Sequence, residues 1–260
     1  MAFPMTANSA RQTLAGLGRF AIFVGEAVRA IFSRNRSLRD VVDQVHFIGV
    51  KSLSVVLITG AFTGMVLCAQ TYFQFHKVKM DSATLAVVSV SLCSELGPVL
   101  AGLMVSGRVG ASMAAQLATM RVTEQIDALR TLGAHPIDHL VVPRLIATIL
   151  ALPLLTTGAI ALGIAAGYVV GVHLLGIDPV YSYHNMIKFT DAQDFQIGIL
   201  KSVFFGAVIA SISTYKGMNC AEGAEGVGRA TTEAVVACSI TILISNFFLT
   251  LFLKNALGAL

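Results

Sequence analysis

One acidic side chain stands in a stretch that is otherwise apolar enough to cross a membrane. Glu95 lies in segment 85–105, whose other residues are all apolar or small. An ionised carboxylate near the bilayer centre costs roughly 2.5–3.5 kcal/mol on insertion scales, so it rarely faces lipid. It faces a partner helix, a watery cavity or a polar ligand group instead. Glu95 is therefore the first candidate for a binding or transport site, and a structural hydrogen bond between packed helices is the alternative.

Two histidines have the spacing of helical metal ligands. His135 and His139 are four residues apart, which places two side chains on one face of a helix. However, Pro136 fits the first turn of a new helix, and no third ligand is obvious nearby in the sequence. We therefore predict no metal site.

The glycine-rich segment 223–232 superficially resembles a phosphate-binding loop. It has Arg229 where that loop needs Lys, and Ala230 where it needs Ser or Thr. An apolar span precedes it, rather than a buried strand. We interpret it as a cytoplasmic turn, with Thr231 or Thr232 capping the last span. Since no nucleophile elbow is present either, we expect a non-catalytic chain without a cofactor of its own.

Composition indicates an integral membrane protein. The 260 residues are 55% hydrophobic and only 12% charged, with a mean hydropathy of +0.78, whereas soluble domains are about 25% charged. Met1–Gln12 is polar and is not a signal peptide. A span needs about 20 apolar residues, and five such stretches lie at about 47–73, 83–107, 144–175, 195–215 and 232–253. We interpret the third as one long or tilted helix containing Pro153.

The N-terminal region differs from the rest. Segment 14–33 has apolar residues at helical spacing with Arg19, Glu26 and Arg29 on another face, which is typical of a helix lying in the membrane interface. We divide the chain into residues 1–45, with this helix and a connector, and a transmembrane domain at 46–260. The predicted fold is all-α, with five transmembrane helices.

The orientation follows from the placement of Lys and Arg. Basic residues concentrate before the first span, between the second and third, and between the fourth and fifth; they include Arg11, Arg19, Arg29, Arg34, Arg36, Arg39, Arg108, Arg121, Arg130, Arg144, Lys216 and Arg229. These segments are expected in the cytoplasm. The N-terminus is then cytoplasmic, and Lys254 near the C-terminus lies on the far side.

The segment between the second and third spans predicts a docking helix. Residues 108–143 are too many for a simple turn. Val122, Ile126 and Leu129 fall on one face of a helix, with Glu124 and Asp127 exposed beside them. Thr123 or Thr119 could cap it, and Gly133 would end it. Such a helix suits docking into a groove of a cytoplasmic partner, or it merely lies on the headgroups.

Several motifs together resemble the MlaE permease family, the membrane subunits of ABC transporters that work with MCE-domain proteins. They read ELGPVLAGLMVSGRVGAS at 95–112, MRVTEQIDAL at 120–129, GAFTGMVL at 60–67 and GRATT at 228–232. The resemblance covers nearly the whole chain beyond about residue 45. The chain departs from the pattern at Ser94, where several relatives carry a basic residue. If that residue pairs with the glutamate, this protein needs another partner for Glu95.

The resemblance implies an assembly and a cargo. Two copies of the chain would pair in the bacterial inner membrane with two ABC ATPase subunits, which bind ATP and magnesium. An MCE-domain hexamer would sit on the periplasmic side, often with a STAS-domain protein on the ATPase. The cargo would be phospholipid, moved between inner and outer membranes to maintain outer-membrane lipid asymmetry.

The resemblance also implies site residues. A lipid pocket at the dimer interface would be lined by Met65, Leu67, Tyr72, Glu95 and Leu96. The coupling helix would contact the ATPase through Thr123, Glu124, Gln125, Ile126, Asp127 and Leu129. Gly97, Pro98, Arg108 and Gly110 would be structural positions of the motif.

The residues alone leave other functions open. Glu95 could carry protons in a secondary transporter, although such proteins often show two related halves and we find none. A membrane enzyme acting on lipids could use Glu95 or His135/His139 as acid or base. A non-transporting scaffold would tolerate loss of Glu95. The direction of transport, the lipid, the charge state of Glu95 and the role of the N-terminal helix stay open.

Overall fold

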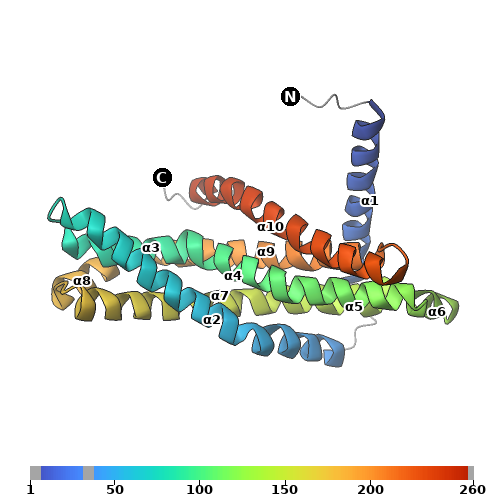
Figure 1. Ribbon diagram of the computed structural model, residues 1–260, viewed down its shortest axis with the longest axis horizontal. Coiled ribbons are helices and arrows are strands. Elements are labelled where there is room, and N and C mark those ends of the chain that lie inside the picture. Colours follow the sequence, from blue (N-terminus) through green and yellow to red (C-terminus); the bar gives the residue numbers. More distant parts are fainter. Residues whose placement is uncertain (1–6, 32–37, 257–260) are drawn as a thin grey trace.

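The computed structural model describes residues 7–31 and 38–256, and every element in these ranges is helical. Five helical stretches are long and apolar enough to cross a membrane: Arg39–His76, Asp81–Val122, Ile137–Leu174, Ala192–Met218 and Gly223–Ala256. The described residues contain no strand. The predicted all-α class with five spans is confirmed. Figure 1 shows these helices bundled side by side, with α1 (Ala7–Ile31) standing across one end of the bundle.

The first span is one helix, and the second is a series of helical segments. The first is α2 (Leu38–His76), so a boundary at residue 45 falls inside a continuous helix. The second runs through the 3-10 turn η1 (Asp81–Ala83), α3 (Thr84–Ser91), the π-helical turn η2 (Leu92–Leu96), α4 (Gly97–Val105), a second π-helical turn η3 (Ser106–Gly110) and α5 (Ala111–Val122).

The remaining elements follow in order. The short α6 (Gln125–Thr131) and the π-helical turn η4 (Ile137–Val141) lead into α7 (Val142–Val169), which contains Pro153 and continues into another such turn, η5 (Val170–Leu174). The single long third span is confirmed. Then come α8 (Pro179–Phe189), α9 (Ala192–Met218) and α10 (Gly223–Ala256).

The second span extends well past its predicted end at residue 107. Helix α5 continues it to Val122, so much of the predicted connector belongs to the span. Met113, Ala114, Leu117 and Ala118 are buried within α5, where the helix packs against α9 and α10. The small and apolar side chains on that face allow close packing, so the helix continues through this segment. The connector proper begins at Thr123.

Glycines bring α2 and α7 into backbone contact. A side chain on Gly60 would come within 2.6 Å of the Ala159 carbonyl oxygen, and one on Gly64 would overlap the backbone of Gly163. The Gly60–Gly64 motif and the one at Gly163 thus face each other within one chain. This close approach lets the two spans pack without intervening side chains.

Helix α1 is fastened to the bundle by aromatic and apolar contacts. Phe20 and Phe23 both meet the Tyr215 ring of α9 edge-on, and Ala27 is buried in a cluster with Val141 and Leu145. The exposed apolar side chains Leu14, Leu17 and Ile22 lie elsewhere on α1. The predicted amphipathic helix is confirmed as a helix, and its place in the membrane interface stays a prediction.

Helix α8 is an element that the sequence did not predict. It lies at the opposite end of the bundle from α1 and α6 (Figure 1). Asp178 caps it by accepting hydrogen bonds from the backbone N–H groups of Val180 and Tyr181. With 11 residues it is too short to register as a span, so hydropathy alone indicates a polar loop at this place.

Candidate functional site

Glu95 lies on a π-helical turn whose geometry follows from the two residues Gly97 and Pro98. In an α-helix the carbonyl of Ser94 would accept from the N–H four residues later, but that residue is Pro98, which has no N–H. The N–H of Gly97 instead donates to Leu92 O, five residues back. The ELGP sequence therefore leaves the Ser94 carbonyl free to bind another donor. π-Helical turns of this kind recur at functional sites.

Lys201 of α9 donates a hydrogen bond to this carbonyl. Its Nζ lies 3.0 Å from Ser94 O, 2.7 Å from Glu95 Oε2 and 2.8 Å from Thr250 Oγ1. An ammonium group has three N–H donors, so every one is used. Lys201 is fully buried, whereas 31% of the Glu95 side chain is exposed. The carboxylate is therefore the accessible side of the ion pair.

Helix α10 completes the polar cluster, which we define as Glu95, Lys201, Asn246 and Thr250. The Asn246 side-chain amide donates to Glu95 Oε2 at 3.1 Å, and the Thr250 hydroxyl lies 3.1 Å from Glu95 Oε1. Asn246 Oδ1 is buried without a partner among the described residues. Three separate spans therefore meet at one carboxylate.

A close backbone approach positions Lys201. Gly198 lies one helical turn before it, and a side chain there would overlap the Cys93 carbonyl of η2. Only glycine lets α9 come this near the π-helical turn. The ammonium group of Lys201 can then reach Ser94 and Glu95, rather than extending past them.

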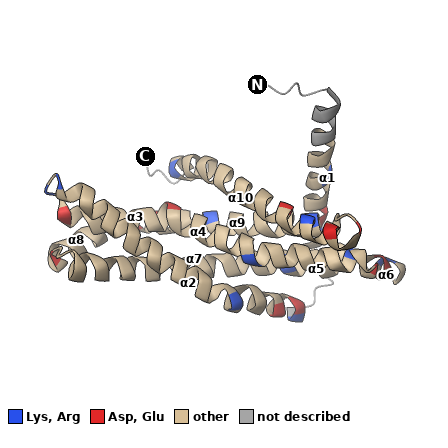
Figure 2. Cartoon of the chain, in the orientation of Figure 1, with Lys and Arg blue, Asp and Glu red and all other residues tan. Residues whose placement is uncertain are grey.

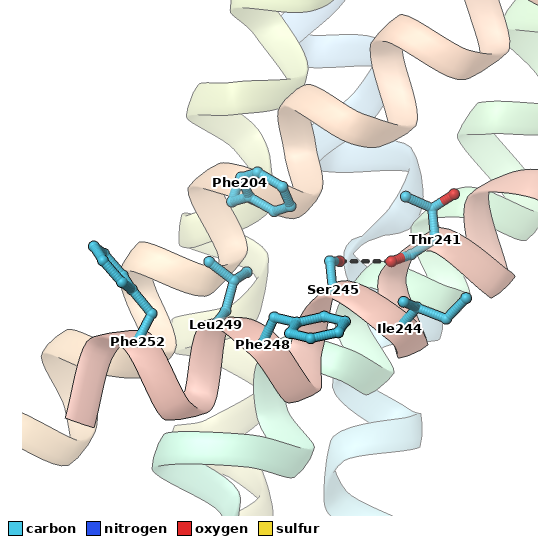
Figure 3. A pocket seen from close by; sticks show the side chains of 7 residues that line it. All are labelled: Phe204, Thr241, Ile244, Ser245, Phe248, Leu249 and Phe252. Atoms are coloured by element: carbon cyan, nitrogen blue, oxygen red, sulfur yellow. Dashed lines mark hydrogen bonds between the residues drawn. The ribbon is translucent and has the colours of Figure 1, made fainter. Parts of the chain in front are cut away.

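An apolar groove lies between α9 and α10 (Figure 3). Its volume is about 550 Å³, and its lining residues are Phe204, Thr241, Ile244, Ser245, Phe248, Leu249 and Phe252. Phe204 follows Lys201 by one turn, and Leu249 adjoins Thr250. The Ser245 hydroxyl donates to Thr241 O at 2.6 Å, so it is already satisfied within its helix. The groove thus offers chiefly aromatic and aliphatic surface.

The predicted pocket residues lie partly elsewhere. Leu67 and Leu96 pack on the same apolar cluster around Cys68 and Leu92. Met65 is half-buried on α2, and the Tyr72 ring stacks near His76 toward the end of α2. Glu95 itself bonds to α9 and α10. In the single chain, Leu67 and Leu96 therefore belong to one apolar cluster. The described contacts of Glu95 and Tyr72 are with other residues.

Lys201 is the residue of the candidate site that we did not predict. It stands in the fourth apolar stretch, between Leu200 and Ser202. The cost of placing a charge within a span, which singles out Glu95, applies equally to a cation and could have found it. Because Ser94 is not basic, the sequence left the partner of Glu95 open, and the structure pairs Glu95 with Lys201. The Ser94 hydroxyl donates to Val90 O, and Lys201 supplies the charge.

The predicted docking helix forms α6, with a different start. Thr123 does not cap it, because its hydroxyl donates to Thr119 O in the preceding helix. The start is Glu124, whose φ of +59° is left-handed, and no side-chain cap bond forms there. Ile126 is buried, whereas Gln125 is exposed and Leu129 is half-buried. Gly133 follows the helix at φ +77°, as predicted for a helix end.

The charges of α6 are joined to α5. Asp127 accepts from Arg121 at 2.6 Å and from Arg130 at 3.0 Å, and this trio holds the corner between the two helices. A cavity of about 520 Å³ adjoins it, lined by Arg121, Val122, Glu124, Asp127, Cys220, Ala221 and Glu222. Burial raises the pKa of the Cys220 thiol there, and nearby Arg121 opposes this. Most of the charged side chains that line the cavity are acidic.

Of the other motif residues, the glycines occupy packing positions. A side chain on Gly97 would press on Ile160, and one on Gly110 would press on Ser213 Oγ at 2.9 Å. Arg108 is exposed on η3. His135 and His139 have no third ligand nearby, since no group of three potential metal ligands occurs among residues 7–31 and 38–256.

Comparisons with known proteins identify the family of the chain. A model of the permease MlaE family matches residues 41–252. A probable ABC transporter permease protein of Rickettsia conorii is 46% identical over 239 residues, which cover 92% of each chain. One from Synechocystis is 39% identical over 90% of this chain and 89% of its own. The chloroplastic Arabidopsis thaliana protein TRIGALACTOSYLDIACYLGLYCEROL 1 is 36% identical over 91% of this chain and 68% of its own. The chain therefore belongs to the MlaE permease family and is an ABC transporter permease.

Proposed function

We propose that this permease moves phospholipids between the inner and outer membranes, driven by a separate ATPase subunit. The observation that carries the proposal is the partly exposed Glu95–Lys201 pair, together with an apolar groove formed by the same two helices, α9 and α10, that supply Lys201, Asn246 and Thr250. A phospholipid has one polar headgroup and two acyl chains. The charges and amide donor of the polar cluster suit the headgroup. The phenylalanines of the groove between α9 and α10 suit the acyl chains.

The charge pattern of the cluster bears on the headgroup. Lys201 has no free donor while it is bound to Ser94, Glu95 and Thr250. A phosphate oxygen would have to displace Glu95 from the ammonium group, and a headgroup amine could bind the exposed side of the carboxylate without breaking the pair. The cluster can thus switch between a closed ion pair and a lipid-bound arrangement. ATP binding elsewhere would bias these states only by favouring one of them.

Energy coupling is assigned to α6. Its exposed residues Glu124 and Gln125 stand at one end of the bundle, and Ile126 anchors the helix beneath them. Docking of α6 into a groove of the ATPase would transmit movement through α5 to η3 and η2, since these segments form one continuous span. The site then lies on the span that leads directly into the docking helix.

The proposed setting is the bacterial inner membrane, with the N-terminus in the cytoplasm. Lys and Arg residues gather at the end of the bundle that carries α6 and the start of α10 (Figure 2), in keeping with the rule that places them inside. Two copies of the chain would pair with two ATPases, an MCE-domain hexamer and a STAS-domain protein. The Arabidopsis relative carries a diacylglycerol lipid in its name, which supports a lipid cargo.

Purification from mild detergent tests this assembly. The tagged chain should bring down an ATPase, an MCE-domain protein and phospholipid, all identified by mass spectrometry. Recovery of the chain alone and free of lipid would contradict the proposal. Lipid-free protein that transports under a pH gradient would favour a proton-coupled secondary transporter with Glu95 as the carrier.

A further inference from the structure

A second charged cavity lies at the junction of α1, α9 and α10, apart from the polar cluster. Its volume is about 330 Å³, and its lining includes Arg19 of α1, Lys216 of α9, and Arg229 and Glu233 of α10. Tyr215 and Asn219 also contribute to the wall. Three cations thus surround a single carboxylate. We propose that this cavity binds the phosphate of an anionic phospholipid headgroup.

The ion pairs within the cavity leave positive charge unmatched. Glu233 accepts from Lys216 Nζ at 2.8 Å and from Arg229 Nε at 2.8 Å, so one carboxylate serves two cations. The Arg19 side chain is exposed and forms no ion pair with any described carboxylate. A lysine and an arginine held in place by Glu233, with a third cation opposite them, can surround a phosphate from both sides.

The surroundings of the cavity select a lipid as the source of that phosphate. Phe20 and Phe23 of α1 pack on Tyr215, which lines the cavity. On the same helix Leu14, Leu17 and Ile22 are exposed, as in a helix lying among headgroups and upper acyl chains. The cavity is then at headgroup depth. Basic pockets between spans on the cytoplasmic side suit anionic headgroups.

The excess positive charge is confined to this cavity, because the neighbouring cavity beside α6 is mostly acidic. Both cavities share Cys220 and Ala221 in the turn between α9 and α10. On the far side of that turn, Glu124, Asp127 and Glu222 outnumber Arg121. A phosphate is therefore attracted to one side of the turn and repelled from the other. This separation keeps a lipid bound near α1 away from the proposed docking surface of α6.

Binding to the purified full-length chain in detergent tests the proposal. The probes are short-chain phosphatidylglycerol, short-chain phosphatidylcholine, glycerol 3-phosphate and inorganic phosphate, and Kd is measured for each. Phosphatidylglycerol should bind most tightly. Arg19→Gln and Lys216→Gln should each weaken it about fivefold, as expected for one basic side chain at a membrane surface. Arg130→Gln is the matched control, because it lies at the same end of the bundle outside the cavity, and it should leave Kd unchanged.

Two further variants distinguish a loss of binding at this cavity from misfolding and from lipid binding at the polar cluster. Glu233→Gln removes the negative charge that competes with a phosphate, while its amide oxygen can still accept a hydrogen bond from Lys216 or Arg229. It should therefore tighten phosphatidylglycerol binding, a gain that misfolding cannot produce. Glu95→Gln/Lys201→Met should leave this binding in place, which separates it from the polar cluster. Unchanged Kd in both Arg19→Gln and Lys216→Gln would overturn the proposal. Equal affinity for inorganic phosphate would overturn its lipid part.

Discussion

Two groups of charged side chains in this permease differ in burial, and therefore in how much each ion pair contributes to stability. In the polar cluster, Lys201 is fully buried and all three of its donors are used. In the corner between α5 and α6, Arg121, Asp127 and Arg130 have side chains 38–58% exposed. Water can replace any partner at the corner, so such pairs contribute little. Within the spans water does not readily replace a lost partner, so removal of one charge alone leaves the other without compensation.

The largest effect is expected from removing the buried cation of the Glu95–Lys201 pair. Lys201→Met leaves Glu95 without its cation, and removal of one partner of a buried pair costs about 3–5 kcal/mol of unfolding free energy. Unfolding in mixed micelles measures it. The double variant Glu95→Gln/Lys201→Met removes both charges and should recover most of that loss. If the double variant is as unstable as the single one, charge pairing is not what holds the cluster.

The next largest loss of stability is expected where α9 packs closely against η2, at Gly198. Gly198→Ala inserts a methyl group against the Cys93 carbonyl, and overpacking of this kind costs about 1–3 kcal/mol. The same micelle titration checks it. Gly107→Ala is the matched control, since nothing lies within 4 Å of a side chain there. It should be neutral or stabilising by up to about 1 kcal/mol. Equal losses in both variants would count against the close approach.

A smaller effect on stability, with a larger one on transport, is expected at Pro98. Pro98→Ala supplies an N–H that can donate to the Ser94 carbonyl, in competition with Lys201. Stability should change by less than about 1 kcal/mol, because one hydrogen bond replaces another. Lipid transfer by the reconstituted transporter should fall. Unchanged transfer would show that the free carbonyl does not matter to the site.

The smallest effect on stability is expected at the exposed corner. Glu124→Lys with Asp127→Lys should cost no more than about 1 kcal/mol, in line with surface pairs, yet should uncouple ATP hydrolysis from transport. ATPase association in detergent and lipid transfer are measured together. Glu124→Gly is the control for backbone strain, because glycine adopts the left-handed φ at this position freely. Normal association of the double variant would remove α6 from the coupling role.

The same contrast explains which features could be predicted from the sequence. Five spans, Pro153 inside the third and a helix near Ile126 follow from hydropathy and periodicity, which are local signals. The partner of Glu95 depends on which face of α9 meets η2, and that is fixed by Gly198 and Pro98 acting from different spans. The extension to Val122 escaped prediction because Arg108, Gln116 and Arg121 lower the hydropathy of this segment, although its small residues, such as Ala114 and Ala118, are fully buried.

The most direct test of the central claim is lipid cross-linking beside the cluster. A photo-reactive phenylalanine analogue replaces Phe204, and attached phospholipid is quantified by mass spectrometry in the otherwise unaltered chain and with Glu95→Gln/Lys201→Met. The same analogue at Phe62, exposed on α2, reports on bulk lipid. We predict that the double variant loses most cross-linking at position 204 and none at 62. Equal cross-linking at position 204 in both backgrounds would contradict a headgroup site at Glu95 and Lys201.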